Sequence, residues 1–268
     1  MNSDSQVRVL DLEGKEIEDV KVPRVFRLLV RQDLILRAFI SLDSHRRAVQ
    51  GRDPLAGERT TAETSNPPTG RGISRIPRVK GEQYSKSGMA GGVASIVHGR
   101  LPFPPRSEKV IRKEINKKER RLALAHAIAA TADQNIVSKR GHHFKSDLPI
   151  VISDEVEKLA KVRDLKKLFV ALGAEKEFER VNERTKKERT RYARVKRSAT
   201  GPLFVVSDSR HLKGILKSVS GFSVVKGSEL SVLDLAPGSA AGRLTIWSKS
   251  ALTSLPKPVI EIGERYAS

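Results

Sequence analysis

Arginine and lysine are the residues whose type and spacing indicate a chemistry in this sequence, and that chemistry is phosphate binding. The chain has 51 Lys and Arg against 31 Asp and Glu. Residues 51–105 have 8 basic and 4 acidic residues, Arg106–Arg121 have 8 and 3, and Arg184–Arg197 have 8 and 1. Together these segments carry +16 of the net charge of +20. A nearly neutral body with basic segments is typical of a protein that binds a polyanion.

Nucleic acid is the polyanion that these segments favour. Arginine binds phosphate with two parallel hydrogen bonds, and glycine lets the backbone come close to it. The chain has only 12 Phe, Trp and Tyr, so we do not expect a surface on which bases stack. The residues predicted to bind phosphate are Arg46, Arg47, Arg52, Arg59, Arg71, Arg75, Arg78, Lys80, Lys86, Arg100, Arg106, Lys113, Lys117, Lys118, Arg120, Arg121, Lys186, Lys187, Arg189, Arg191, Arg194, Lys196 and Arg197.

No motif of an active site, a metal site or a cofactor site is present in the sequence. Neither a phosphate-binding G-x-x-x-x-G-K-[ST] loop nor a G-x-G-x-x-G pattern occurs, and the absence of cysteine excludes thiolate chemistry. His142 and His143 are interpreted as an RNA contact or a turn, since neighbouring residues do not share a helix face. We therefore predict no catalytic residues, no metal and no cofactor. A nucleic-acid-processing α/β enzyme remains the alternative, and a DNA-binding regulator would need a recognition helix that the sequence does not show.

The second half of the chain has the rhythm of alternating strands and helices. Three apolar runs, Pro149–Ile152, Leu203–Val206 and Leu244–Trp247, each end at a Ser or Asp that can cap a following helix. A further strand is expected at Phe222–Val225, before a helix capped by Ser228. Continuously apolar strands indicate a parallel sheet covered on both faces. The expected fold is α/β, a three-layer, Rossmann-like and mostly parallel sheet flanked by helices, with one long extended loop inserted.

The remaining elements are expected as follows. Val7–Leu10 is a strand, Pro23 opens a helix, and Asp33 caps a second helix with an apolar side of Leu34, Ile35, Ala38, Phe39 and Leu42. Ile111, Ile115, Leu122, Ala125 and Ala129 fit one face of a long helix from Ser107 to about Thr131. Glu175–Arg197 is expected to begin as a helix that gives way within the basic run Arg184–Arg197.

Residues 51–105 contain 9 of the 19 glycines and 7 of the 13 prolines. Ordering a residue costs about 1–2 kcal/mol, and this segment has too few apolar residues to recover that cost. We expect it to be disordered in the free protein and ordered by a partner. The predicted division is a globular RNA-binding domain of residues 1–50 and 106–268 and an extended loop of residues 51–105. No apolar run approaches the ~18 residues of a membrane span, and a soluble intracellular protein is expected.

Four motifs in order resemble the universal ribosomal protein L four family, in its archaeal and eukaryotic branch. They are QGRDPLAGERT (Gln50–Thr60), GRGISRIPRV (Gly70–Val79), NKKERRLAL with AIAATA (Asn116–Ala132), and VLDLAPG with GRLTIW (Val232–Trp247).

The resemblance implies a cytoplasmic protein of the large ribosomal subunit that binds ribosomal RNA early in assembly and contacts neighbouring ribosomal proteins. It also implies that the loop lies in the wall of the peptide exit tunnel. The tip near the nascent peptide would then comprise Gly70, Arg71, Gly72, Ile73, Ser74, Arg75 and Arg78.

Overall fold

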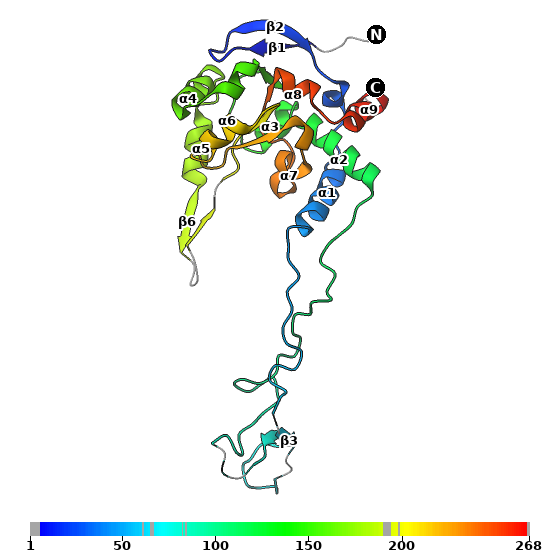
Figure 1. The fold of residues 1–268 in the computed structure, drawn as a ribbon, viewed down its shortest axis with the longest axis vertical. Coiled ribbons are helices and arrows are strands. Elements are labelled where there is room, and N and C mark those ends of the chain that lie inside the picture. Colours follow the sequence, from blue (N-terminus) through cyan, green and yellow to red (C-terminus); the bar gives the residue numbers. More distant parts are fainter. Residues whose placement is uncertain are drawn as a thin grey trace. The chain divides into compact units, whose positions relative to one another are not determined.

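The computed structural model describes residues 6–60, 62–64, 67–81, 83, 85–189, 194–197 and 199–266 (Figure 1). The chain divides into two compact units. One unit combines Met1–Asp43 with Lys113–Ser268, and the other is Ser44–Arg112. We call them the globular unit and the inserted unit.

A six-stranded sheet organises the globular unit. Only β1 and β2 pair in the antiparallel direction, and all other neighbouring strands are parallel. The α/β class with a mostly parallel sheet is therefore confirmed, as are the strands expected near residues 7, 150, 204, 223 and 246. In spatial order the strands are β2 (Glu16–Lys21), β1 (Gln6–Leu10), β5 (Ile150–Ile152), β10 (Thr245–Ser248), β8 (Leu203–Val206) and β9 (Ser223–Lys226).

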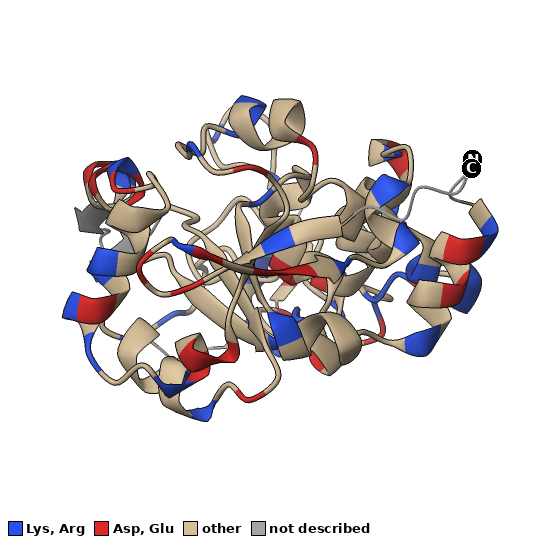
Figure 2. Cartoon of the chain, turned by 90° about the horizontal axis from the view of Figure 1, so that it is seen from above, with Lys and Arg blue, Asp and Glu red and all other residues tan. Residues whose placement is uncertain are grey.

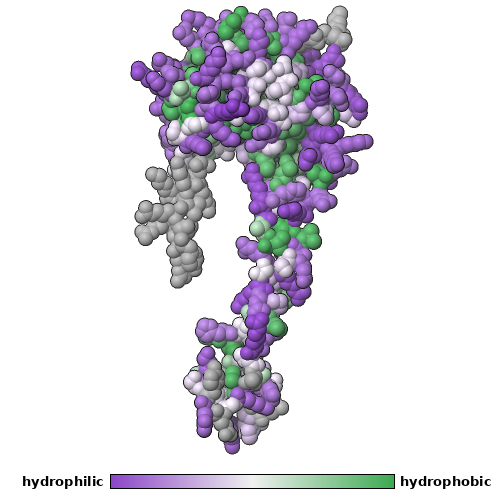
Figure 3. All heavy atoms as spheres, viewed as in Figure 1, coloured by the Kyte–Doolittle hydropathy of each residue, from purple (hydrophilic) through white to green (hydrophobic). Residues whose placement is uncertain are grey.

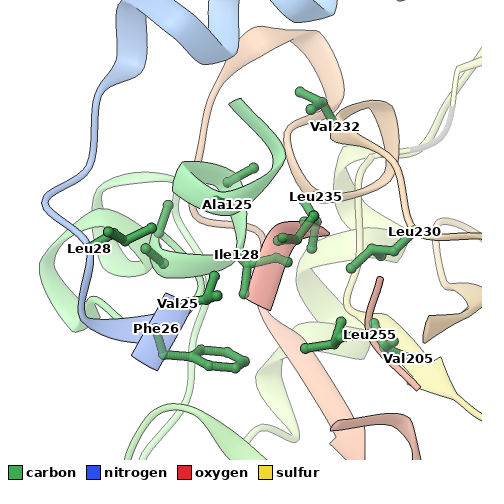
Figure 4. Close-up of a cluster of buried hydrophobic side chains, with 14 of the residues drawn as sticks. Val25, Phe26, Leu28, Ala125, Ile128, Val205, Leu230, Val232, Leu235 and Leu255 are labelled. Atoms are coloured by element: carbon green, nitrogen blue, oxygen red, sulfur yellow. The ribbon is translucent and has the colours of Figure 1, made fainter. Parts of the chain in front are cut away.

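Hydrophobic residues pack on both faces of this sheet. Side chains alternate between the faces of a strand, and in β5 Val151 joins one hydrophobic cluster while Ile150 and Ile152 join another. Figure 4 shows part of the first cluster, in which Phe26 and Ile128 come from different helices. Burial on both faces explains why the strands are continuously apolar.

Helices and 3-10 turns cover the sheet. The first cluster includes residues of α1, α2, α7, α8 and α9, and the second includes residues of α4, α5 and α6. Their bounds are η1 (Arg24–Arg27), α1 (Gln32–Ser44), α2 (Lys117–Ala129), α3 (Gln134–Lys139), η2 (Asp154–Lys158), α4 (Val162–Ala171), α5 (Lys176–Arg184), α6 (Arg210–Leu216), η3 (Gly227–Glu229), α7 (Val232–Leu235), η4 (Pro237–Ser239), α8 (Lys249–Thr253) and α9 (Lys257–Tyr266).

The predicted helix starts are partly right. Ser248 caps α8, since its hydroxyl accepts a hydrogen bond from the Ala251 N–H at 3.2 Å. The expected cap at Ser228 is wrong, because Ser231 caps α7 in a reciprocal pair with Asp234. Pro23 precedes a 3-10 turn rather than an α-helix.

Asp33 lies in the first turn of α1, which begins at Gln32, and does not cap that helix. Its carboxylate pairs with Arg31 at 2.6 Å. The apolar side expected for this helix is confirmed, since Leu34, Ile35 and Ala38 are buried.

The long helix expected from Ser107 to Thr131 is wrong over its first ten residues. Helix α2 begins only at Lys117, where the Asn116 side chain accepts a hydrogen bond from the Lys118 N–H. The preceding residues are not helical, and the Lys113 carbonyl accepts a hydrogen bond from the buried Ser41 hydroxyl at 2.7 Å. Ile115 packs on the first hydrophobic cluster from this extended chain, so its spacing to Ile111 does not arise from a helix.

The helix expected from Glu175 gives way where the basic run begins, as predicted. Helix α5 ends at Arg184, and Thr185 has extended backbone. Strand β6 (Lys186–Arg189) then pairs antiparallel with β7 (Arg194–Arg197). Repulsion within a block of like charges disfavours a helix, in which such residues lie one turn apart.

Strand β2 was not predicted from the sequence. Its residues, EIEDVK, are almost all exposed because it lies at the sheet edge with one strand as neighbour. Charged residues are typical of edge strands, where they oppose pairing with other chains. Figure 2 shows acidic and basic residues interspersed over the helices of the globular unit.

At the carboxyl ends of the parallel strands, side chains of the chain itself join three loops. The Glu157 carboxylate accepts hydrogen bonds from the N–H groups of Ser207 and Asp208, at 2.7 and 3.0 Å, and from the Ser248 hydroxyl at 2.8 Å. Asp154 accepts from the N–H of Ser250 at 2.8 Å. This edge is where open α/β sheets usually bind ligands, and here a carboxylate of the protein takes the N–H donors.

Candidate nucleic-acid interface

The inserted unit contains two short strands, β3 (Ala62–Thr64) and β4 (Pro77–Val79), which pair antiparallel. Residues 51–105 were expected to have no regular structure, and this small hairpin corrects that expectation. A third segment, around Met89 and Gly91, lies beside β4. The Val79 N–H donates to the Met89 carbonyl at 2.8 Å, and the Gly91 N–H donates to the Pro77 carbonyl at 3.0 Å. No other helix or strand occurs among the described residues between α1 and α2.

Two runs of the inserted unit lie against each other. The Arg52 N–H donates to the Pro105 carbonyl at 3.0 Å. Gly57 has φ +86°, and a Cβ atom there would lie 2.5 Å from the carbonyl carbon of Gly99. A side chain fits neither this backbone conformation nor this space, so glycine is required where the runs meet.

The structure places Arg78 inside the hairpin region rather than at its surface. Its guanidinium donates to the Gly88 carbonyl at 2.9 Å and to the Ser74 carbonyl at 3.3 Å. The side chain is half-buried. Arg78 therefore stabilises the loop conformation with the donors that were expected to bind phosphate.

Three further basic residues of the inserted unit form ion pairs. Arg59 lies 2.7 Å from Asp53, Arg100 lies 3.7 Å from Glu58, and Lys80 pairs with Glu63. All six side chains are largely exposed, and such pairs contribute at most about 1 kcal/mol. A phosphate can therefore replace the carboxylate at little cost.

The other predicted cations of this unit are exposed. The described part of the chain offers no ion pair or hydrogen bond to the side chains of Arg46, Arg52, Arg71, Lys86 and Arg106. Arg75 donates to the Thr69 hydroxyl, at 3.2 Å. Arg47 is also exposed. Figure 3 shows mainly hydrophilic residues over the visible surface of this unit, with apolar residues between them.

The residues expected at the loop tip adjoin one another. Gly70 and Gly72 have φ of +93° and +64°, and no atom lies within 4 Å of a Cβ placed on either. Gly70, Arg71, Gly72, Ile73, Ser74 and Arg75 are exposed, whereas Arg78 is half-buried.

In the globular unit, Lys113, Lys117, Lys118, Arg120 and Arg121 are exposed, four of them on the first turns of α2. The first two turns of this helix hold one acidic residue, Glu119, which pairs with Arg37 at 2.9 Å. The excess of positive charge on this part of α2 therefore faces solvent.

The β6–β7 hairpin places like charges opposite one another. Its register pairs Lys186 with Arg197, Lys187 with Lys196 and Arg189 with Arg194. Like charges directly opposite on neighbouring strands are destabilising. Arg191 lies outside the described residues.

A buried ion cluster was missed by sequence reasoning. Glu177 is fully buried and contacts the Arg180 guanidinium at 2.7 Å and His142 Nδ1 at 3.0 Å, and it accepts from the His143 N–H at 2.7 Å. Burial raises the pKa of Glu177, but the hydrogen bonds from His142, Arg180 and the His143 N–H outweigh it and lower this pKa to about 2. Burial lowers the pKa of His142, which is therefore neutral.

This cluster corrects the interpretation of His142 as an RNA contact or a simple turn, because its ring is buried against a carboxylate. His143 remains exposed. Arg180 also donates to the Thr200 carbonyl at 2.8 Å, close to the end of β7. The cluster thus fixes the chain where it leaves the basic hairpin and approaches strand β8. The i, i+3 spacing of Glu177 and Arg180 was its one signal in the sequence.

A second buried cation, Arg243, was also missed. It donates to the carbonyls of Gly201 at 2.8 Å and Asp234 at 2.9 Å and to the Ser223 hydroxyl at 2.6 Å. Burial lowers its pKa to about 10. Its donors are satisfied within the fold, so it is structural.

Among the described residues, no group of three His, Cys, Asp or Glu side chains is placed to hold a metal ion. Within the same residues, none of the helices has the length and apolar character needed to cross a membrane.

Comparison with known proteins gives a family and a set of relatives. Residues 20–257 match the sequence pattern of the ribosomal protein L4/L1 family. The large ribosomal subunit protein uL4 of Sulfolobus acidocaldarius is 41% identical over 258 residues, which cover 93% of each chain. The proteins of the same name from Aeropyrum pernix and Halobacterium salinarum are 41% and 37% identical, over 96% and 92% of this chain and 94% and 97% of their own lengths.

Proposed function

The chain belongs to the ribosomal protein L4/L1 family, and on this premise we propose that it is a structural protein of the large ribosomal subunit that binds ribosomal RNA. The relatives named above are proteins of that subunit, in archaeal organisms. The family is one of structural proteins, so the alternative of a nucleic-acid-processing enzyme is wrong.

The composition and burial of the inserted unit carry this proposal. It has 13 Lys and Arg against 5 Asp and Glu. No hydrophobic side chain is buried among its described residues. A segment without a core cannot balance the entropy cost of its order from its own contacts, and its excess of cations makes RNA phosphate the partner that supplies the difference.

The β6–β7 hairpin supports the same conclusion. Three of its four residue pairs in register join two cations, and bound phosphates would turn this repulsion into attraction. The exposed cations of α2 add a third basic surface. The proposed RNA-binding residues are those predicted from the sequence, with Arg78 stabilising the loop rather than binding phosphate.

The finer parts of the proposal follow from the family. Residues 51–105 form a loop that reaches into the RNA and contributes to the wall of the exit tunnel, with the tip at Gly70–Arg78 near the nascent peptide. Residues 1–50 and 106–268 form a Rossmann-like three-layer domain that holds RNA and contacts neighbouring ribosomal proteins. The protein binds early in assembly and resides in the cytoplasm, within the ribosome.

The salt dependence of binding tests this function. Neutralising about 10 phosphates gives a slope of roughly −7 to −9 for log K against log salt concentration. The measurement is a filter-binding titration of the full chain on large-subunit ribosomal RNA from 50 to 500 mM KCl, values chosen to span roughly one decade of salt. An affinity that hardly changes with salt would contradict the proposal.

The hairpin can be tested by charge removal. Lys187→Gln with Lys196→Gln should make the slope shallower by about 1.4–1.8, or 0.7–0.9 for each lost phosphate contact. Lys158→Gln with Lys166→Gln is the matched control, since it removes the same charge from exposed positions in η2 and α4. Equal slopes for the two double variants would show that the hairpin does not bind phosphate.

Protease sensitivity tests the expected disorder of the loop. We expect trypsin to cut the free chain first at the arginines of residues 51–105, and bound ribosomal RNA to protect them. Loops without a core open at little cost in free energy. Equal resistance of this segment with and without RNA would contradict the expectation.

A further inference from the structure

An apolar cavity of about 340 Å³ opens on the globular unit, and the proposed RNA binding uses only its two arginines, not its apolar lining. Helices α1 and α2, the segment before α7 and the start of α9 form its walls. Seven of its ten lining residues are apolar, and its only charged residues are Arg120 and Arg121. The apolar lining residues are Leu42, Leu124, Leu230, Val232, Pro256, Pro258 and Val259.

A second cavity of about 330 Å³ continues the first along α2 and α9. The two cavities share Arg121 and Pro258. Lys118, Arg265 and the exposed Tyr266 lie along the second cavity, together with the acidic Glu119 and Glu261. We call the two cavities together the α2–α9 groove, which has an apolar first half and a more polar second half.

The floor of the apolar half is fixed by the core of the globular unit. Leu230 and Val232 are buried members of the first hydrophobic cluster, as Figure 4 shows. Leu42 and Leu124 are half-buried and pack against the same cluster. The cavity therefore has rigid walls on several elements, as ligand pockets usually have.

The chemistry of the lining identifies the occupant. RNA bases in protein pockets stack on aromatic side chains and form hydrogen bonds along their edges. The apolar half contains no aromatic residue, and the hydroxyl of Ser231, its one uncharged polar side chain, already donates to Asp234 at 2.5 Å. An aliphatic or aromatic side chain of a protein fits this lining better than a base does.

The two arginines of the apolar half indicate which residue would lie next to the bound apolar side chain. Arg120 and Arg121 are exposed, and the part of the chain that the structure describes gives neither guanidinium a carboxylate partner. Arginine pairs with carboxylates through two parallel hydrogen bonds. A carboxylate beside the apolar side chain would therefore complement this groove.

We propose that the α2–α9 groove binds an acidic segment of a neighbouring protein, with one Leu, Ile, Met or Phe side chain in the apolar half and an adjacent Asp or Glu paired with Arg120 or Arg121. The proposal rests on the proposed function, since it places this protein among others in the large subunit. It specifies which side chains a neighbouring protein of the subunit would contribute to one contact.

Selection of binding peptides tests the proposal on the full chain. A displayed library of random dodecapeptides should yield sequences in which a large apolar residue lies within two positions of Asp or Glu. Leu42→Trp fills the apolar half without changing charge and should abolish binding of the selected peptide. A selection without such a pattern, or equal binding by Leu42→Trp, would overturn the proposal.

A charge exchange tests the second half of the recognition and does not depend on the stability of Leu42→Trp. Arg121→Glu should weaken the peptide at least about tenfold, equivalent to about 1.4 kcal/mol, and Lys in place of the peptide's Asp or Glu should restore binding. Lys166→Glu, the same charge reversal on exposed α4, is the control and should have no effect. An Arg121→Glu variant that binds like this control would contradict the proposal.

Titration of ribosomal RNA separates this inference from the proposed function. Leu42→Trp should bind RNA with unchanged affinity and salt slope. If this variant loses RNA affinity, the groove takes a nucleotide and the inference is wrong. A flat salt dependence of the unaltered chain would instead contradict RNA binding itself, in an assay that contains no peptide.

Discussion

Replacing Glu177 by Gln is expected to destabilise the globular unit strongly. The folded state lowers the pKa of this carboxyl from 4.5 to about 2. A difference of one pKa unit corresponds to about 1.4 kcal/mol, so the ionised carboxylate contributes on the order of 3 kcal/mol to folding. Gln also leaves the buried Arg180 without its counter-charge, an arrangement that costs about 3–5 kcal/mol in other proteins.

The pH dependence identifies the ionised group. Because the pKa of Glu177 is lower in the folded state, its contribution is fully present above pH 4.5 and is lost as the pH falls towards 2. About 2 of the roughly 3 kcal/mol should be gone by about pH 3. Other carboxylates titrate in the same range, so the quantity to follow is the difference between the unaltered chain and Glu177→Gln.

Urea unfolding at several pH values is the assay. At pH 7 we expect Glu177→Gln to lose about 3–5 kcal/mol of unfolding free energy. Glu179→Gln is the matched control, because it makes the same change on the exposed side of α5 and should cost less than about 0.5 kcal/mol. The reasoning is refuted if the two variants agree within 1 kcal/mol, or if their difference is as large at pH 3 as at pH 7.

Three smaller changes test other parts of the fold. Glu157→Gln should cost about 1–3 kcal/mol of unfolding free energy, because it weakens the hydrogen bonds to two N–H groups and a hydroxyl. The control is Glu155→Gln, at an exposed position in the same turn, which should cost almost nothing. Gly57→Ala should weaken ribosomal RNA binding roughly fivefold, because the loop conformation that RNA orders then costs about 1 kcal/mol or more. Gly214→Ala, in α6 with no atom within 4 Å of the new methyl group, should raise unfolding free energy by about 0.5–1 kcal/mol.

The sheet was the most predictable part of the fold. Buried parallel strands are apolar throughout, and the short apolar runs near Val151, Val205 and Ile246 each end at a serine. The polar residue after each run is equally informative where it caps a helix, as Ser248 does. Strand β2 carries no such signal, because an edge strand with one neighbour needs no apolar face.

The basic segments were predictable in position but not in structure. Their composition indicates a polyanion partner, which does not depend on whether the backbone is helical or extended. The helix before the basic run was predicted, but the hairpin that follows Thr185 was not. The inward position of Arg78 was not predictable either, since its acceptors are backbone carbonyls that only the folded loop brings together.

The buried polar groups were the least predictable. Glu177 and His142 are 35 positions apart, and nothing local indicates that they meet. Arg243 donates to segments from three separate parts of the chain. Such side chains resemble surface residues in a sequence, because their burial depends on partners that only the tertiary fold supplies.

The placement of the charges explains how this α/β protein can bind RNA without using the carboxyl ends of its parallel strands, where such sheets usually bind ligands. At the carboxyl ends of the strands, Glu157 takes the N–H groups of two residues that could otherwise hold an anion. Meanwhile the cations lie in segments outside the sheet: the inserted unit, the start of α2 and the β6–β7 hairpin. A change in those segments can therefore alter RNA binding without disturbing the core. A substitution of Glu157 should instead lower stability, because the Glu157 carboxylate joins three loops at the carboxyl ends of the strands.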